Sequence, residues 1–175
     1  MRRVPTFKRQ ALIALALLPV LGACAHTPPM PGGRAWLWPL GAQSVGEVDW
    51  SPEAGEGKAV LVQFMATWCL PCLQQQPALE ELRARFEPQG LQIVWVGMDL
   101  EGALVLEPFA ERAQPGWPVL VADQALRDGQ SLYGRVMELP QTVLLGRDGR
   151  PVGAWYGVAS PARIAPLVQK ALAQD

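Results

Sequence analysis

The 175-residue sequence lacks any excess of positive charge, because 16 Asp and Glu outnumber 15 Lys and Arg. Proteins that bind DNA or RNA need clustered basic residues against the phosphates, and the basic residues here are scattered. We therefore expect no nucleic-acid partner. The length and the hydrophobic fraction of 50% suit one globular domain of ordinary size.

The sequence is also poor in metal ligands, with three cysteines and a single histidine, His26. A structural zinc site usually takes four Cys or His ligands, and no such set is present. A copper site built from two thiolates and the distant His26 fails for the same reason. We expect neither a metal nor another cofactor.

The apolar run near the amino terminus is too short to span a membrane. It covers the eleven residues Ala11–Leu21 and is interrupted by Pro19. A spanning helix needs about 20 apolar residues. Four positive charges in residues 1–10 precede the run, which is typical of a secretory signal. An ordinary signal peptide without lipidation and a short buried helix are the two alternatives to the more specific signal that the end of the run indicates.

The end of this run, Leu21-Gly22-Ala23-Cys24, resembles the lipoprotein box of bacteria, in which the cysteine becomes the lipidated first residue. The resemblance implies acyl chains on Cys24 that anchor the protein to a bacterial membrane, facing the periplasm or the cell exterior. Residues 1–23 are then the signal peptide. Residues 24–35, rich in proline and glycine, form a flexible tether, and residues 36–175 form the folded domain.

If Cys24 is acylated, only Cys69 and Cys72 remain, spaced as Cys-x-x-Cys. Two cysteines provide no structural disulfide framework. A bridge between them also closes a loop too short to constrain the unfolded chain strongly. The pair therefore indicates redox chemistry more than a structural role.

The apolar pattern around the pair predicts a strand, a helix and a second strand. Residues 58–65 form a continuous apolar run typical of a strand buried on both faces. The two cysteines follow, and apolar residues then recur at helical spacing as far as Phe86. Leu91–Gly97 is a second buried strand, so the two strands are parallel.

The rest of the chain supplies further elements around this unit. Asp148-Gly149 lies between two apolar segments and predicts an antiparallel hairpin. Pro108 either starts or kinks the helix in which it lies. The full set is a partly alternating edge hairpin within residues 36–57, a helix over 102–113, a short strand over 117–122, a helix from the N-cap Asp123 to Tyr133, hairpin strands 142–145 and 152–156, and a last amphipathic helix after Ser160.

Together, Ala66-Thr67-Trp68-Cys69-Leu70-Pro71-Cys72 after a buried strand and Leu139-Pro140-Gln141-Thr142 before a hairpin resemble the thioredoxin fold. The chain is most similar to the TlpA/ResA-like branch of membrane-anchored, extracytoplasmic thiol-disulfide oxidoreductases, over about residues 40–174. The resemblance implies a three-layer α/β/α sandwich. Its mixed sheet carries an N-terminal edge hairpin and an inserted helix-strand element at residues 102–122.

The chemistry of the pair follows from its position at the start of a helix. Unpaired N–H groups and the positive end of the helix dipole stabilise the Cys69 thiolate, which is the nucleophile in disulfide exchange. Cys69 attacks a client disulfide, and Cys72 then attacks Cys69 to release the product. The reverse sequence oxidises a client dithiol.

Several neighbours are expected to support the pair. Pro71 lies in the first helical turn, where its missing N–H costs little. Trp68 is expected to be a partly exposed cap over the thiols, with core filling as the alternative. Pro140 resembles the family's cis-proline, which would expose the Leu139 backbone to a client strand; a trans proline opening an edge strand is the alternative.

The position six residues before Cys69 departs from the pattern of many thioredoxins. They place a buried Asp there that assists proton transfer from the second cysteine, whereas this chain has Gln63, which cannot act as a general base. The resemblance implies a carboxylate from a neighbouring loop instead. Asp99 and Glu101 are the candidates, and both are alternatively plain surface carboxylates.

We therefore predict a lipid-anchored thiol-disulfide oxidoreductase that reduces protein disulfides, as relatives do in the maturation of cytochromes or copper proteins. Its partners are protein dithiols or disulfides and a membrane thiol electron donor, both implied by the resemblance. Oxidase or isomerase activity on secreted proteins is one alternative. The other is a non-catalytic module that uses the Leu139-Pro140 edge to hold an extended client.

Overall fold

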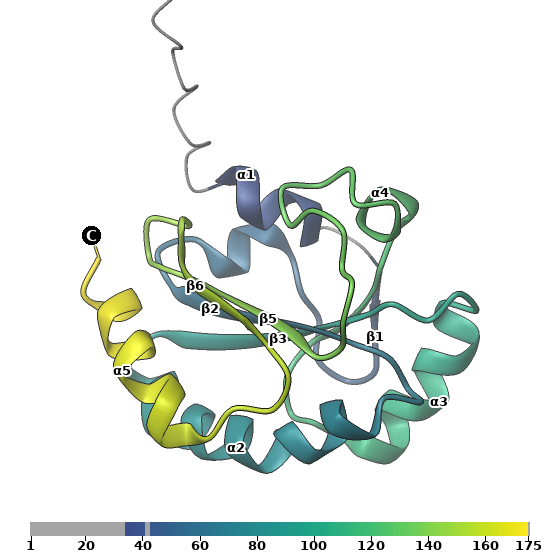
Figure 1. Ribbon diagram of the computed structural model, residues 1–175, viewed down its shortest axis with the longest axis horizontal. Coiled ribbons are helices and arrows are strands. Elements are labelled where there is room, and N and C mark those ends of the chain that lie inside the picture. Colours follow the sequence, from purple (N-terminus) through teal and green to yellow (C-terminus); the bar gives the residue numbers. More distant parts are fainter. Residues whose placement is uncertain (1–33, 41–42, 175) are drawn as a thin grey trace, which may run out of the picture.

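The computed structural model describes residues 34–40 and 43–174. The predicted signal peptide, the lipidation site Cys24 and most of the tether lie outside the described residues. Six strands form one mixed sheet in the order β1-β4-β3-β2-β5-β6, with helices on both faces (Figure 1). The strands are β1 Ser44–Val45, β2 Ala59–Met65, β3 Leu91–Gly97, β4 Val119–Val121, β5 Gln141–Leu145 and β6 Pro151–Tyr156.

The helices divide into two layers (Figure 1). One layer holds α2 Leu70–Phe86, α3 Ala103–Ala113 and α5 Pro161–Leu172, and the other holds α1 Arg34–Leu37 and α4 Gln124–Arg127. Short 3-10 turns are η1 Trp38–Leu40, η2 Pro52–Gly55 and η3 Glu87–Gln89. The predicted three-layer α/β/α arrangement is confirmed.

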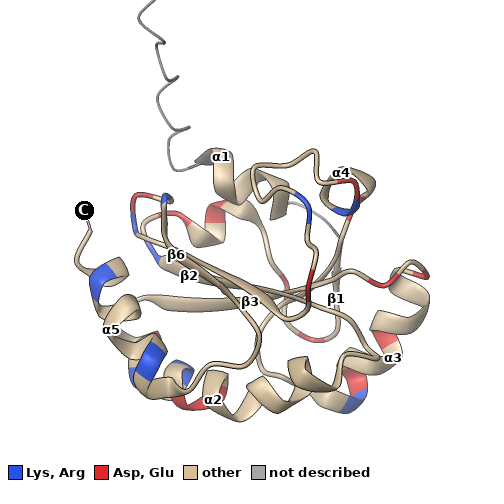
Figure 2. Ribbon diagram, viewed as in Figure 1, with Lys and Arg blue, Asp and Glu red and all other residues tan. Residues whose placement is uncertain are grey.

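Strand β2 is the centre of the molecule, and all seven of its residues are buried. It pairs in parallel with β3 and antiparallel with β5. Leu61 and Met65 face the layer of α2, α3 and α5, whereas Val62 and Phe64 face the layer of α1 and α4. No strand contains a charged residue, and the charges lie on helices and loops (Figure 2). Burial on both faces explains this composition.

The strand-helix-strand unit around the cysteines agrees with the sequence. Helix α2 ends at Phe86, and Gly90 adopts a left-handed φ of 100° before β3 begins at Leu91. Strand β4 continues the parallel part of the sheet beside β3. Strands β5 and β6 form the predicted antiparallel hairpin, and Gly149 in its turn has a φ of 71°. Pro108 lies inside α3, so it does not start that helix.

Three expectations about single elements are wrong. The edge hairpin within residues 36–57 is absent from the described part of that segment, because β1 pairs with β4 and the chain then turns at Gly46, where φ is 86°. Asp123 caps α4 as predicted, but the helix ends at Arg127 and not at Tyr133. A Cβ at Gly129 would lie 2.8 Å from the Arg135 backbone, so the chain folds back there.

The third of these expectations concerns the tether. Arg34 and Ala35 belong to α1 and not to the flexible segment. Leu37 and Leu40 are buried against the sheet face that carries Val62 and Phe64. The folded part of the chain therefore begins at least two residues earlier than expected.

An aromatic contact joins this first helix to a distant loop. The centroid of the Tyr133 ring lies 5.5 Å from the centroid of the Trp36 ring and 5.2 Å from that of the Phe64 ring, in edge-on geometries. The Tyr133 hydroxyl donates a 2.6 Å hydrogen bond to the Trp36 carbonyl. Burial raises the pKa of Tyr133, so its hydroxyl stays protonated and remains a donor. This contact fixes the start of the segment that leads to Leu139.

Gly97, at the end of β3, lies where a side chain has no room. An added Cβ would meet the methyl groups of Leu106 and lie 2.9 Å from its Cγ, and Leu106 is fully buried in α3. We expect Gly97→Ala to lower the free energy of unfolding by about 1–3 kcal/mol in urea titrations, because it overpacks the core.

Gly153→Ala is the matched control. A Cβ at Gly153, in β6, would lie 3.6 Å from Leu167 Cδ1, which is an ordinary contact. Its free energy of unfolding should stay within about 0.5 kcal/mol of wild type. Equal losses in the two variants would contradict the close packing of β3 on α3.

Candidate active site

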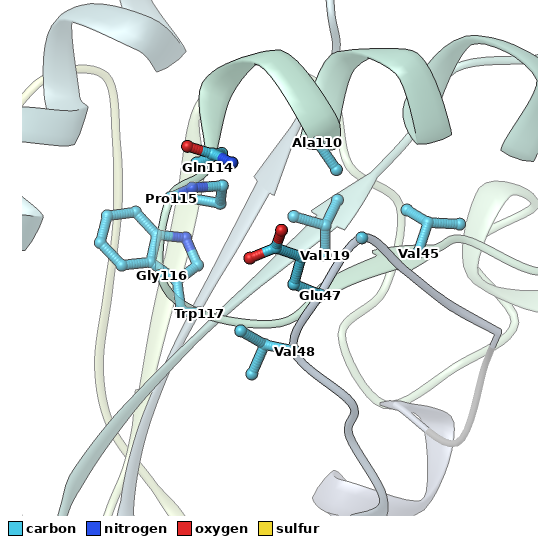
Figure 3. Close-up of a pocket in the computed structure, with 10 residues that line it drawn as sticks. Val45, Glu47, Val48, Ala110, Gln114, Pro115, Gly116, Trp117 and Val119 are labelled. Atoms are coloured by element: carbon cyan, nitrogen blue, oxygen red, sulfur yellow. The ribbon is translucent and has the colours of Figure 1, made fainter.

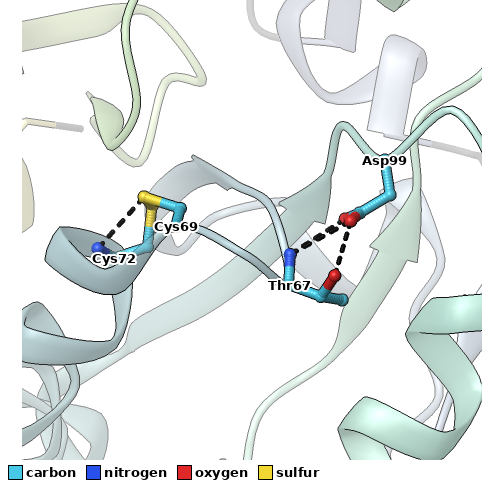
Figure 4. Close-up of a disulfide and its surroundings, with 4 residues drawn as sticks. All are labelled: Thr67, Cys69, Cys72 and Asp99. Atoms are coloured by element: carbon cyan, nitrogen blue, oxygen red, sulfur yellow. Dashed lines mark hydrogen bonds between the residues drawn. A yellow bond between two sulfur atoms is a disulfide. The ribbon is translucent and has the colours of Figure 1, made fainter.

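Cys69 and Cys72 form a disulfide at the start of α2, with a Cα–Cα distance of 5.3 Å (Figure 4). Cys69 is the N-cap residue, and its sulfur accepts a 3.2 Å hydrogen bond from the Cys72 backbone N–H. Pro71 lies in the first turn, as predicted. In the reduced state the same N–H groups and the helix dipole favour a thiolate on Cys69.

The two sulfur-bearing residues differ in their access to solvent. Cys69 is 3% exposed and contributes to a surface groove, whereas Cys72 is fully buried beneath it. A client sulfur can therefore reach Cys69 but not Cys72. This asymmetry is what a nucleophile and a resolving thiol require.

Asp99 holds the turn that precedes Cys69. Its carboxylate accepts hydrogen bonds from the Thr67 backbone N–H at 3.2 and 3.1 Å and from the Thr67 hydroxyl at 2.7 Å. Asp99 is only 2% exposed. In Figure 4 its carboxylate points toward Thr67, with which it makes these hydrogen bonds. The carboxylate is thus placed to position the Cys69 turn.

Glu101, the other predicted carboxylate, and Gln63, which stands where many thioredoxins have a buried Asp, lie in different environments. Glu101 is exposed in the loop before α3. Gln63 is fully buried on the β2 face that α2 covers, and neither its Oε1 nor its Nε2 has a hydrogen-bond partner among the described residues. Gln63 is therefore a buried, uncharged and unpaired group next to the strand end that leads to Cys69.

The Leu139–Pro140 peptide bond is cis, as the resemblance implied. Leu139 lies beside the cysteines and, with Trp68 and Pro71, lines a groove of about 570 Å³. Trp68 is 74% exposed, so it is not core filling. The complete lining is Trp68, Cys69, Leu70, Pro71, Met98, Val136, Met137, Glu138 and Leu139.

The sequence did not point to several of these residues. Met137 and Glu138 precede the Leu139-Pro140 pair in a segment without periodicity, so no pattern marked them. Gln75 was also missed, although it lies one turn beyond Cys72 on the buried side of α2. Its side-chain amide donates to the Ala159 carbonyl at 2.9 Å and accepts from the Ala159 N–H at 2.6 Å. It ties α2 to the loop after β6.

A second, smaller cavity of about 140 Å³ lies between β1, β4 and the end of α3. Figure 3 shows Glu47 and Trp117 among its lining side chains. No cysteine is among the described residues that line it. The described residues contain no group of three or more His, Cys, Asp or Glu side chains that could hold a metal ion. None of the described helices has the length and apolar character needed to cross a bilayer.

The site combines Cys69 at the start of α2, Cys72 buried beneath it and an adjoining apolar groove. This arrangement permits thiol-disulfide exchange. The groove can hold a polypeptide, and Cys69 can exchange a disulfide with it. Among the described residues that line the groove, Glu138 is the one with a charged side chain, and most of the others are apolar.

Known proteins resemble the chain in both sequence and fold. The thiol-disulfide oxidoreductase ResA of Geobacillus thermodenitrificans is 36% identical over 96 residues, which is 54% of this chain and 52% of that protein. The chain thus spans about half the length of this relative.

Two solved structures show the same fold. The thiol:disulfide interchange protein of the thioredoxin family from Chlorobium tepidum aligns with a TM-score of 0.56 and 24% identity, over 75% of this chain and 94% of that one. A thiol-disulfide isomerase from Corynebacterium glutamicum aligns with a TM-score of 0.63 and 16% identity, over 76% and 92%. The predicted thioredoxin-like fold is confirmed.

The profile of the AhpC/TSA family matches residues 38–150, which is more than half of the chain. This range includes the central strand β2, the disulfide at the start of α2 and the cis-proline at Pro140. Because all three fall within one match, the chain belongs to the AhpC/TSA family.

Proposed function

We propose that this protein is a thiol-disulfide oxidoreductase that reduces protein disulfides, with Cys69 as nucleophile and Cys72 as resolving thiol. The observation that carries the proposal is the Cys69–Cys72 pair at the start of α2, with Cys69 lining a groove and Cys72 buried beneath it. The ResA relative is named a thiol-disulfide oxidoreductase, which supports the same activity. The direction, reduction of the client, rests on the resemblance to TlpA/ResA-like proteins.

The reaction balances without a further cofactor. The Cys69 thiolate attacks one sulfur of a client disulfide, and the other client sulfur leaves as a thiolate that takes up a proton. Cys72 loses its proton and attacks Cys69, which releases the second client sulfur as a thiol. Two electrons have passed to the client, and the protein is left with the Cys69–Cys72 disulfide.

The setting of the reaction is part of the proposal. Lipidation at Cys24 would hold the domain on a bacterial membrane, outside the cytoplasm, and a membrane thiol donor would return two electrons after each cycle. Clients would include precursors of cytochromes or copper proteins. The sequence Leu21-Gly22-Ala23-Cys24 supports the anchor, and the resemblance supports the donor and the clients.

A non-catalytic binding module is the second candidate, because the groove beside cis-Pro140 can hold an extended chain without turnover. The intact cysteine pair favours the enzyme, since a module needs neither thiol. Oxidase or isomerase activity is the near alternative and differs from reduction only in the direction of electron flow.

Cys72→Ala removes the resolving thiol and leaves the nucleophile. We expect this variant to accumulate mixed disulfides through Cys69 when it is incubated with an oxidised client, as detected by mass spectrometry under non-reducing conditions. Cys69→Ala should form none, because Cys72 is buried. A client that binds both variants and wild type alike, with no covalent adduct, would establish the binding module.

The reduction potential of the Cys69–Cys72 pair tests the direction. We expect a value near or below about −250 mV, on the thioredoxin side of the known range. Protein produced without residues 1–24 is equilibrated in defined thiol-disulfide buffers, and the free thiols are alkylated and counted. A value near about −120 mV would make the protein an oxidant and overturn the assignment.

Asp99→Asn separates a positioning role from a proton-transfer role. We propose that Asp99 acts through Thr67, so that Asp99→Asn and Thr67→Val both slow client reduction, each by roughly tenfold, as expected for a loss of about 1.4 kcal/mol of positioning. The pH profile of the rate should keep its wild-type shape in both variants.

The carboxylates Asp99 and Glu101 stay the two candidates for proton transfer with Cys72, and the same measurement decides between them. A pH profile that changes in Asp99→Asn but not in Thr67→Val would make Asp99 the proton acceptor and contradict the positioning role. A changed profile in Glu101→Gln would assign proton transfer to Glu101.

A further inference from the structure

The segment that leads to cis-Pro140 has an unpaired backbone. No hydrogen bond joins the main chain of residues 135–139 to any other described residue. The segment is flanked by the buried ring of Tyr133 and by the Pro140 carbonyl, which accepts a 2.8 Å hydrogen bond from the Gly157 N–H. Between these ends it is held by the side chains of Val136 and Leu139, which pack against the core. Free N–H and C=O groups beside a groove can pair with an added extended strand.

The same segment supplies much of the groove wall. Val136, Met137, Glu138 and Leu139 line it from one side, and Trp68 with Leu70 lines it from the other. Trp68, Leu70 and Met137 are 74%, 63% and 71% exposed, so three large apolar side chains are available for contact. Met side chains adapt to different partners, which suits a groove that takes more than one sequence.

Glu138 is the one charged side chain among the residues that line the groove. It is exposed and makes no ion pair with any described residue. Arg135 lies three residues earlier but does not line the groove. Among the described residues that line the groove, Glu138 is therefore the one charge that a client meets, whereas the exposed Arg135 lies at the start of the segment, outside that lining.

Extended pairing of a client beside the cis-proline is what the resemblance to the thioredoxin fold implies, and we propose that the groove also selects client segments by charge. The client lies extended along residues 135–139, its main chain pairs with that segment, and its cysteine faces Cys69. A Lys or Arg close to the client cysteine lies against Glu138, whereas an acidic residue there is rejected. This inference rests on the proposed function and adds a class of client to it: an extended, apolar segment with a basic residue near its cysteine.

The preference is a difference between two interactions. Glu138 attracts a basic neighbour of the client cysteine and repels an acidic one, and no Lys or Arg is among the described residues that line the groove. Because the pair is exposed to solvent, added salt should weaken it.

Short peptides test the charge preference. Each nine-residue peptide has an apolar sequence and a central cysteine in a mixed disulfide with 2-mercaptoethanol, which is neutral. The peptides differ at one site, Lys or Glu, placed in turn at each of the three positions on either side of the cysteine. Reduction transfers two electrons from the Cys69–Cys72 dithiol and releases both thiols. The measured quantity is the rate constant for reduction by the reduced full-length protein.

We expect the Lys peptide to react about fivefold faster than the Glu peptide at the preferred position, and the ratio to fall with salt. Glu138→Gln should bring the ratio close to one, and Glu138→Lys should invert it. Glu107→Gln is the matched control, because Glu107 is an exposed carboxylate on α3 that does not line the groove, and its ratio should equal that of wild type. A wild-type ratio of one at every position, or a ratio that Glu138→Lys leaves unchanged, overturns the charge preference.

N-methylation of single peptide bonds tests the extended pairing. Where a peptide N–H pairs with residues 135–139, its methylation should lower the rate by about tenfold, because about one hydrogen bond is lost. Methylation of the residues in between should have little effect, because the N–H groups of an extended strand point alternately toward and away from the segment. Equal rates at all positions overturn the pairing.

Hydroxyethyl disulfide, which is small and neutral, separates this inference from the proposed function. If the protein reduces hydroxyethyl disulfide but discriminates neither charge nor N-methylation, the inference is wrong and the proposed function stands. If it reduces neither the peptides nor hydroxyethyl disulfide, the proposed function itself is wrong.

Discussion

The hydrogen bonds between Thr67 and Asp99 tie the end of β2 to the end of β3, and the place of the disulfide depends on them. The two strands are parallel neighbours, so the residues that follow them emerge at one edge of the sheet. Asp99 therefore lies close enough to accept hydrogen bonds from Thr67 and hold the turn before Cys69. With that turn fixed, α2 starts where the Cys72 N–H donates to the Cys69 sulfur and where Cys72 is buried in the core.

The opposite wall of the groove is built on a different principle. Tyr133 anchors its start through the carbonyl of Trp36, and the main chain of residues 135–139 then makes no hydrogen bonds with the described protein. A segment held by side-chain packing without main-chain hydrogen bonds is less stable locally than the sheet beside it. The cysteine turn thus presents the Cys69 sulfur to the groove. The main chain of residues 135–139 has free N–H and C=O groups that can pair with a client strand.

The sequence predicted what depends on local patterns. The apolar runs of β2 and β3, the helix after Cys69 and the hairpin at Asp148-Gly149 all carry their own signal, and the structure has each of them. The helix predicted from the N-cap Asp123 to Tyr133 ends at Arg127, because the chain folds back at Gly129 against Arg135, and this contact carries no local signal.

The parts of the site that the sequence missed all depend on tertiary contacts. Thr67 and Asp99 are 32 residues apart, and only the parallel pairing of β2 with β3 brings them together. Once that pairing is inferred, an acidic residue two positions after β3 is a reasonable candidate for contact with the cysteine turn, although its partner is not identifiable. Met137 and Glu138 carry no pattern at all, because their role follows from the groove that Trp68 and Leu70 complete across from them.

Gln63 shows how the buried centre of the site differs from that of thioredoxins with an Asp at this position. Its amide is fully buried without a partner among the described residues, which costs on the order of 1–3 kcal/mol. An unpaired buried carboxylate would cost far more when charged. Because an amide does not titrate, Gln63 has the same charge whether the cysteines are oxidised or reduced. Gln63 can therefore neither take a proton from Cys72 nor return one, so proton transfer with Cys72 falls to another group, for which Asp99 and Glu101 are the candidates.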